Sequence, residues 1–305
     1  MTTTAAAPPW DRDDDRPSTV PKSPAILGHG GAPPWLRRIG RFGLTGFSIF
    51  TLLYLFVPIL VVVVFSFNKP KGKYNYIWNE FSTEAWGDPF KYPELRDALF
   101  LSLKVAAVVT IIATVLGTLM ALAMVKYRFK GKGLLGTLLV LPLTLPEVVL
   151  GFSLLTMFVS ISVDRGFLTI VIAQVMFSVS YVAMTVRARI RGFDWRLEEA
   201  AMDLGASPLR TFRKVTLPLI APGLLAAALL TFAISLDDFI ITYLNSGSSQ
   251  TYPINIWITK KSRIPVQINV FATAILVFCV VVALGGVLAN NRRAKRLGLR
   301  STSDS

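Results

Sequence analysis

The sequence predicts an all-α, polytopic membrane protein with six transmembrane helices. Of its 305 residues, 53% are hydrophobic and only 16% are charged, and the mean hydropathy of +0.55 is too high for one soluble globule with a wetted surface. The apolar residues also gather in runs long enough to cross a ~30 Å hydrocarbon layer at ~1.5 Å of rise per residue. The six runs are 42–67, 98–125, 134–160, 166–187, 218–244 and 268–290.

The basic residues are distributed as a membrane topology requires. A formal charge of +14 would also suit a nucleic-acid-binding protein. If the N-terminus is cytoplasmic, however, 22 of the 32 Lys and Arg fall in inside segments, nine in outside loops and one, Lys104, within a span. This is the positive-inside bias of membrane proteins. We therefore expect cytoplasmic N- and C-termini and no nucleic-acid partner.

Polar segments set the expected domain boundaries. Residues 1–34 are rich in Pro, Gly, Ala and Asp without periodicity, which predicts a disordered cytoplasmic tail. The first apolar run lies too far into the chain and is too long for an ordinary secretory signal, so we expect a retained span. Residues 35–291 then form the transmembrane domain, and 292–305 form a basic cytoplasmic tail.

Two irregular segments follow in chain order. The third run contains Pro142 and Pro146, and each removes a backbone hydrogen bond and crowds the preceding turn, so a kink is expected. Such prolines are often only structural, so the kink could serve either transport or the shape of the bundle alone.

The outside loop 245–267 carries an apolar patch around Trp257 that would either dip into the membrane interface or present a docking surface.

The polar segment 192–218, between the fourth and fifth runs, has the signals of two short helices. Asp194 is a good N-cap, and Gly205 can adopt the left-handed conformation that ends a helix. Ser207 can cap a second helix that has Pro208 at its first position. The segment therefore predicts a helix, a Gly turn and a second helix.

Small residues make the first of these helices approachable. Ala200 and Ala201 would let another surface come close to the backbone. On the cytoplasmic side of a membrane protein, such a helix is suited to dock into a soluble partner protein. An amphipathic connector lying on the lipid head groups is the alternative, and residue chemistry alone does not separate the two.

The spacing in this segment resembles the EAA loop of permease subunits of bacterial ABC importers. The family pattern is EAA, three residues, Gly, nine residues and Ile-x-Leu-Pro, and this chain departs from it only in a conservative Val215. The resemblance implies a type I permease-like bundle whose loop docks into a cleft of a cytoplasmic ATPase subunit. The implied coupling residues are Glu199, Ala200, Ala201, Gly205, Leu217 and Pro218.

The same resemblance implies the partners. The chain has no GxxxxGK[ST] stretch, so ATP and Mg²⁺ are assigned to a separate ATPase subunit and no cofactor or metal to this chain. A complete importer implies a second, related but different permease, two cytoplasmic ATPase subunits and an extracytoplasmic binding protein, in contact with lipid in the bacterial inner or plasma membrane. With a single His29, a single Cys279 and no HExxH or GxSxG, the chain is not expected to be an enzyme.

The resemblance covers nearly all of residues 42–291 and is closest to the second permease subunit of the spermidine/putrescine branch. The shared features are RFKGK (128–132), RARIRGFD (187–194), SLDDF (235–239), Pro146-Glu147-Val148, and Asn269, Ala272 and Thr273. One departure is Gln267, where this branch is expected to carry Glu. If that acid captures cations, this chain lacks it.

A polyamine is a flexible polycation, so its path should offer spaced carboxylates and aromatic faces. Acids within spans are candidates by default, and Glu147 falls in the outer half of the third run while Asp237 and Asp238 fall near the outer end of the fifth. If those helices face each other, the acids line one path, to which Tyr243 and Trp257 would add cation–π contacts. Alternatively, Asp237 and Asp238 lie at a solvated helix end, and the two aromatic residues belong to the belt at the membrane interface.

Three rival functions remain open. A permease of the same superfamily could carry another solute, and the acids argue against an anion but not against a neutral solute or a metal complex. A stand-alone secondary carrier or channel would be driven by ion gradients, would need no ATPase and would leave the EAA spacing as coincidence. A membrane-embedded enzyme has little chemistry available to it.

Overall fold

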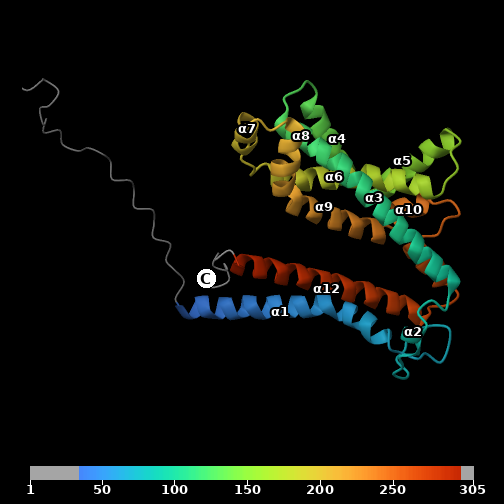
Figure 1. Cartoon of the computed structure of the whole chain (residues 1–305). Helices are drawn as coiled ribbons and strands as arrows, with labels where there is room; N and C mark the ends of the chain where they lie inside the picture. Colours follow the sequence, from blue (N-terminus) through green and yellow to red (C-terminus); the bar gives the residue numbers. More distant parts are fainter. Residues whose placement is uncertain (1–33, 297–305) are drawn as a thin grey trace, which may run out of the picture. The chain divides into compact units, whose positions relative to one another are not determined.

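The computed structural model describes residues 34–296, which are mostly helical (Figure 1). Residues 1–33 and 297–305, which hold most of the two expected tails, lie outside the described residues. The helices are α1 (Pro34–Phe65), α2 (Glu84–Gly87), α3 (Pro93–Lys126), α4 (Lys132–Thr144), α5 (Glu147–Ser160), α6 (Phe167–Ile190), α7 (Arg196–Asp203), α8 (Pro208–Thr211), the π-helix η1 (Phe212–Thr216), α9 (Leu217–Asp237), α10 (Ile240–Asn245), α11 (Tyr252–Thr259) and α12 (Val266–Arg296).

The described helices confirm the predicted all-α membrane class. Four helical stretches are long and apolar enough to cross a membrane, and a fifth span is counted if α4 and α5 are taken together. The apolar stretch Val266–Val281 of α12 accounts for the start of the predicted sixth span. The four stretches are Gly43–Phe65, Pro93–Lys126, Phe167–Ile190 and Pro208–Asp237.

The third predicted span, 134–160, is not one kinked helix. It is divided into α4 and α5, which are bent by 108° at the break. Leu145 is extended, with φ −79° and ψ 142°, because the ring of Pro146 disfavours the helical conformation in the residue before it. Pro142, which was also expected to contribute to the kink, lies inside α4. The chain therefore breaks at the second proline, and more sharply than the sequence predicts.

The fifth predicted span, 218–244, is also interrupted. α9 ends at Asp237, and Asp238 is extended with ψ 119° before the separate helix α10 begins. The Asp238 carboxylate accepts the Thr242 N–H at 2.9 Å, which satisfies a backbone donor of the first turn of α10. Asp238, which was predicted to lie near the outer end of one helix, instead lies between two helices, α9 and α10.

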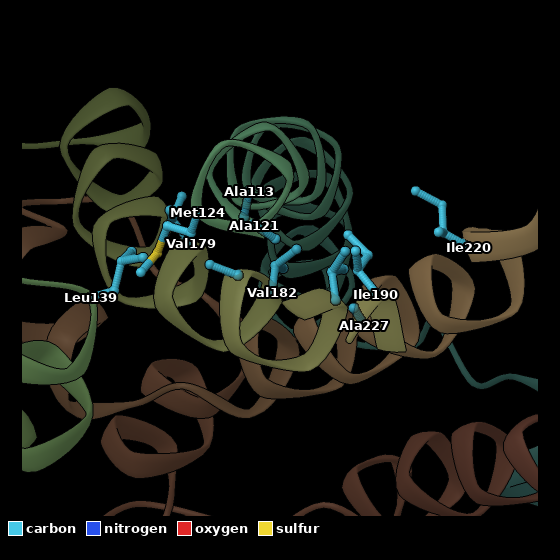
Figure 2. Close-up of a cluster of buried hydrophobic side chains, with 11 residues drawn as sticks. Ala113, Ala121, Met124, Leu139, Val179, Val182, Ile190, Ile220 and Ala227 are labelled. Carbon is cyan, nitrogen blue, oxygen red and sulfur yellow. The ribbon is translucent and has the colours of Figure 1, made fainter. Parts of the chain in front are cut away.

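The chain divides within α1, at Ile59 and Leu60, into two compact units. The second unit holds every candidate site residue and a core between α3, α6 and α9. Figure 2 shows this core: Ala113 and Ala121 of α3, Val182 of α6 and Ala227 of α9 are all at most 1% exposed. Small side chains allow these helix backbones to approach closely, as is common between membrane helices.

Gly117 is the closest of these approaches, and replacing it with Val should destabilise the core. A Cβ at this position would lie 2.6 Å from the Val182 Cβ and 3.0 Å from the Ala183 backbone nitrogen. Such overpacking costs ~1–3 kcal/mol or more, because backbone cannot move aside as a flexible side chain can. Thermal unfolding of the purified protein in detergent should show a lower midpoint for Gly117→Val. Gly133→Val is the matched control, since its Cβ would meet nothing within 4 Å, and an equal loss in both variants would contradict the explanation.

Candidate functional site

The polar segment folds as the predicted helix, Gly turn and second helix, although the Ser207 side chain makes no capping hydrogen bond. The Asp194 Oδ1 accepts the Arg196 N–H at 3.1 Å where α7 begins, one residue later than expected. Gly205 has φ +84°, the left-handed conformation that a Gly after a helix supplies at least cost. Pro208 is the first residue of α8, which continues through η1 into α9. The chain thus reverses at Gly205 and returns along α7.

The outward face of this segment combines the predicted coupling residues with apolar side chains. Glu199 and Ala200 are exposed and Ala201 is half-buried. Leu217 packs against the core and Pro218 is exposed at the start of α9. Exposed apolar side chains on a polar segment are typical of a surface that binds another protein. The large exposed apolar residues here are Leu197, Met202, Leu204 and Leu209, and Leu204 is 90% exposed.

The inward face of α7 contains a buried acid that was not among the predicted coupling residues. Glu198 is 5% exposed, and its carboxylate accepts hydrogen bonds from the Lys126 ammonium and the Thr216 hydroxyl. The Lys126 ammonium also lies 5.5 Å from the centre of the Trp195 ring. The available signal was spacing: Trp195 and Glu198 are three residues apart, so they lie on the same side of the helix.

The second candidate site lies where the two broken spans meet. α10 packs on α5 and α6, with Ile241 in one buried cluster with Leu150, Leu154 and Ala173. The Asn245 amide donates to the Gly151 carbonyl at 3.3 Å, which ties α10 to α5. One turn earlier in α5, Glu147 is exposed at the break between α4 and α5. The packing of α10 on α5 therefore brings together the two broken spans that carry Glu147 and Asp238.

A polar network holds the Asp238 carboxylate. It accepts hydrogen bonds from the Thr242 hydroxyl and N–H and from the Gln174 amide, the last at 3.3 Å. Gln174 is 3% exposed and also accepts a hydrogen bond from the Ser235 hydroxyl. Sequence reasoning missed Gln174, although an amide in the middle of an apolar run is itself a signal of an interior polar contact. Asp237, the neighbouring candidate, is exposed.

The predicted aromatic residues are joined through one that was not predicted. Phe239 stacks on Tyr243 with ring centres 5.4 Å apart and contacts Trp257, also at 5.4 Å. Tyr243 and Trp257 are 51% and 46% exposed, so both rings can be reached from outside. The Lys260 ammonium lies 3.0 Å from the centre of the Trp257 ring. A cation of the chain itself therefore already occupies one face of that indole.

Gln267, the departure from the expected Glu, is 6% exposed at the start of α12. It lines a cavity of about 710 Å³ whose charged lining residues are Lys69, Lys73, Lys91, Arg263, Glu84 and Asp88. The cations outnumber the acids there, so this cavity is a poor match for a polycation. The acids that suit one lie at the broken spans.

The fold defines a multi-pass membrane protein in which two apolar spans are broken and a polar helix–turn–helix lies between the fourth and fifth runs. The chain belongs to the binding-protein-dependent transport system inner membrane component family, whose pattern it matches over residues 113–296. The predicted recognition as an ABC importer permease is thereby confirmed, and the chain is a transport subunit rather than an enzyme.

Relatives and solved structures agree with this assignment. The chain is 38% identical to the putrescine transport system permease protein PotI of Escherichia coli, over 73% of this chain and 82% of that protein. It is 35% identical to the spermidine/putrescine transport system permease protein PotC of Haemophilus influenzae, over 78% and 93% of the two chains. Its fold resembles that of a bacterial ABC transporter involved in the import of alginate, with a TM-score of 0.61, 14% identity and coverage of 83% and 97%.

Proposed function

We propose that this chain is one membrane-spanning half of an ATP-driven importer of polyamines. The observation that carries the proposal is that Glu147 and Asp238 lie at the breaks of two spans that pack together through α5 and α10, beside the rings of Phe239 and Tyr243. Ionisable groups at membrane depth are expensive and persist where a pathway needs them. Two acids and aromatic faces match the spaced ammonium groups of putrescine or spermidine. The relatives in Escherichia coli and Haemophilus influenzae are putrescine and spermidine/putrescine permeases, which supports the same solute class.

The proposal extends to the partners. A cytoplasmic ATPase subunit docks on the outward face of α7, with Glu199, Ala200, Ala201 and Gly205 at the contact. A second ATPase serves a second permease of related but different sequence, which completes the path. An extracytoplasmic binding protein delivers the polyamine on the opposite side, and both termini of this chain are cytoplasmic. ATP and Mg²⁺ bind the ATPase, because GxxxxGK[ST] does not occur in this chain.

The test is to purify the complex through this subunit, identify its partners and reconstitute it in liposomes with the binding protein. Putrescine or spermidine should stimulate ATP hydrolysis and accumulate inside only when ATP is present. A neutral sugar and the anionic alginate serve as controls, and neither should stimulate. Stimulation by a control and not by a polyamine would show that the solute is wrong. Uptake driven by an ion gradient without ATP would instead favour a stand-alone carrier.

A further inference from the structure

The most unusual charged contact in the described part of the chain is the ion pair of Glu198 with Lys126. Among the side chains that the structure describes there are three other ion pairs, and in each of them both side chains are at least 36% exposed. The Glu198 side chain is 6% exposed and that of Lys126 is 40% exposed. Exposed pairs contribute little to stability, whereas breaking a buried pair leaves an uncompensated charge in the interior. Glu198 is therefore part of the interior and not of the solvated helix surface.

One carboxylate thereby joins three elements. Lys126 is the last residue of α3, Glu198 lies in α7, and Thr216 is the last residue of η1, directly before α9. We call these three residues the Glu198 clamp. The wide turn of the π-helix ends at Thr216, whose side chain is buried against the carboxylate. Both α3 and the α8–α9 stretch are candidate spans, so the clamp ties α7 to the last residue of the first and to the residue directly before α9 in the second.

Aromatic packing holds the same end of α7. Phe193 and Trp195 contact each other edge to face with ring centres 4.7 Å apart, and both pack against the core of α3, α6 and α9. The Lys126 ammonium lies over the Trp195 ring and bonds Glu198 at the same time. Consecutive residues of α7 thus have opposite surroundings, with Glu198 buried against the spans and Glu199 exposed.

We propose that Glu198 is a positioning residue that transmits movement of α7 to α3 and α9 together. The inference rests on the proposed function, in which an ATPase binds the outward face of α7. A partner docked on α7 can move the spans only through the contacts that α7 makes with them. The Glu198 clamp supplies the charged contacts, and Phe193 and Trp195 supply the apolar ones. A contact that moves α3 and α9 with α7 also moves α7 when α3 and α9 move. The clamp should therefore also relay the docking of the binding protein to the ATPase.

The variant that tests this is Glu198→Gln in the complete importer, reconstituted with its binding protein and supplied with putrescine. Gln can still accept the Thr216 hydrogen bond but cannot pair with Lys126. We expect the ATPase to copurify in the normal ratio and to keep its basal rate. Stimulation by the loaded binding protein, and putrescine taken up per ATP hydrolysed, should each fall about tenfold, which is within the usual size of a coupling energy. The charge swap Lys126→Glu with Glu198→Lys should recover part of both readouts.

The matched control is Glu84→Gln, the same change in an exposed pair. Its carboxylate lies 3.0 Å from the Lys69 ammonium, and that hydrogen bond lowers the pKa of Glu84. We expect no change in either readout, because solvent can replace an exposed partner.

Two outcomes would overturn the proposal. One is a normal uptake per ATP in Glu198→Gln. The other is a loss of uptake in strict proportion to loss of copurified ATPase, which would make the residue only structural. If the unmodified complex took up no putrescine, the proposed solute would be wrong, and the stimulation of ATPase by the binding protein would still decide the role of Glu198.

Discussion

Gly205→Val should release the ATPase from the purified complex, whereas Gly205→Asn should retain it. Gly205 has φ +84°, where a side chain costs roughly 1–2 kcal/mol and a β-branched one is a genuine outlier. Asn is among the residues that tolerate this conformation. A Cβ at Gly205 would meet nothing within 4 Å, so the difference between the variants comes from the backbone and not from a clash. ATPase copurified per tagged permease should fall about tenfold for Val and less than threefold for Asn.

A control within the same polar segment separates this effect from the added side chain. Gly192 also has open space around its Cβ position but is not left-handed, so Gly192→Val should keep the ATPase. Membrane insertion, measured as permease recovered from the membrane fraction, should be normal in all three variants because no core contact changes. The turn would have no role in docking if Gly205→Val bound the ATPase as well as the unmodified chain does.

Features with a local chemical cause were predictable from the sequence. Runs of apolar residues gave the membrane class, because hydrocarbon admits only chains whose backbone groups are bonded internally. Asp194, Gly205 and Pro208 marked the turn and helix ends of the polar segment, since capping depends on neighbouring residues alone. The spacing of the family pattern also has a local cause. The nine residues between Gly205 and Val215 form the returning part of the segment, and they place Thr216, which follows Val215, in contact with Glu198.

Features that depend on distant residues were not predictable from the sequence. Pro146 indicated a kink, but α5 leaves α4 at 108° and its Leu150 and Leu154 pack on α6 and α10. Asp238 was assigned to a continuous helix, yet its carboxylate accepts from Gln174, 64 residues earlier. Glu198 meets Lys126 at a separation of 72 residues. In each case a partner far along the chain decides the geometry, and a single sequence does not show which residues become partners.

Asp238→Asn should reduce polyamine uptake more strongly than any other single change at the broken spans. Asn keeps the shape of the side chain and a carbonyl oxygen that can still accept the Thr242 N–H, so α10 should still begin at Ile240. What is lost is the negative charge at the break between α9 and α10. A carboxylate bond to an ammonium group contributes about 1.5–3 kcal/mol, so uptake at low putrescine should fall about tenfold or more.

Glu147→Gln and Asp237→Asn complete the series. Glu147 is exposed at the first turn of α5, within range of the same cation, and its loss should also lower uptake. Asp237 lies outside the Gln174 network and is exposed to solvent, so its loss should cost less than that of Asp238. Copurified ATPase should stay normal in all three variants, because the Glu198 clamp and the outward face of α7 are unchanged. If Glu147→Gln and Asp238→Asn both transport putrescine at the normal rate, the paired acids do not form the cation path, and the broken spans serve only to shape the bundle.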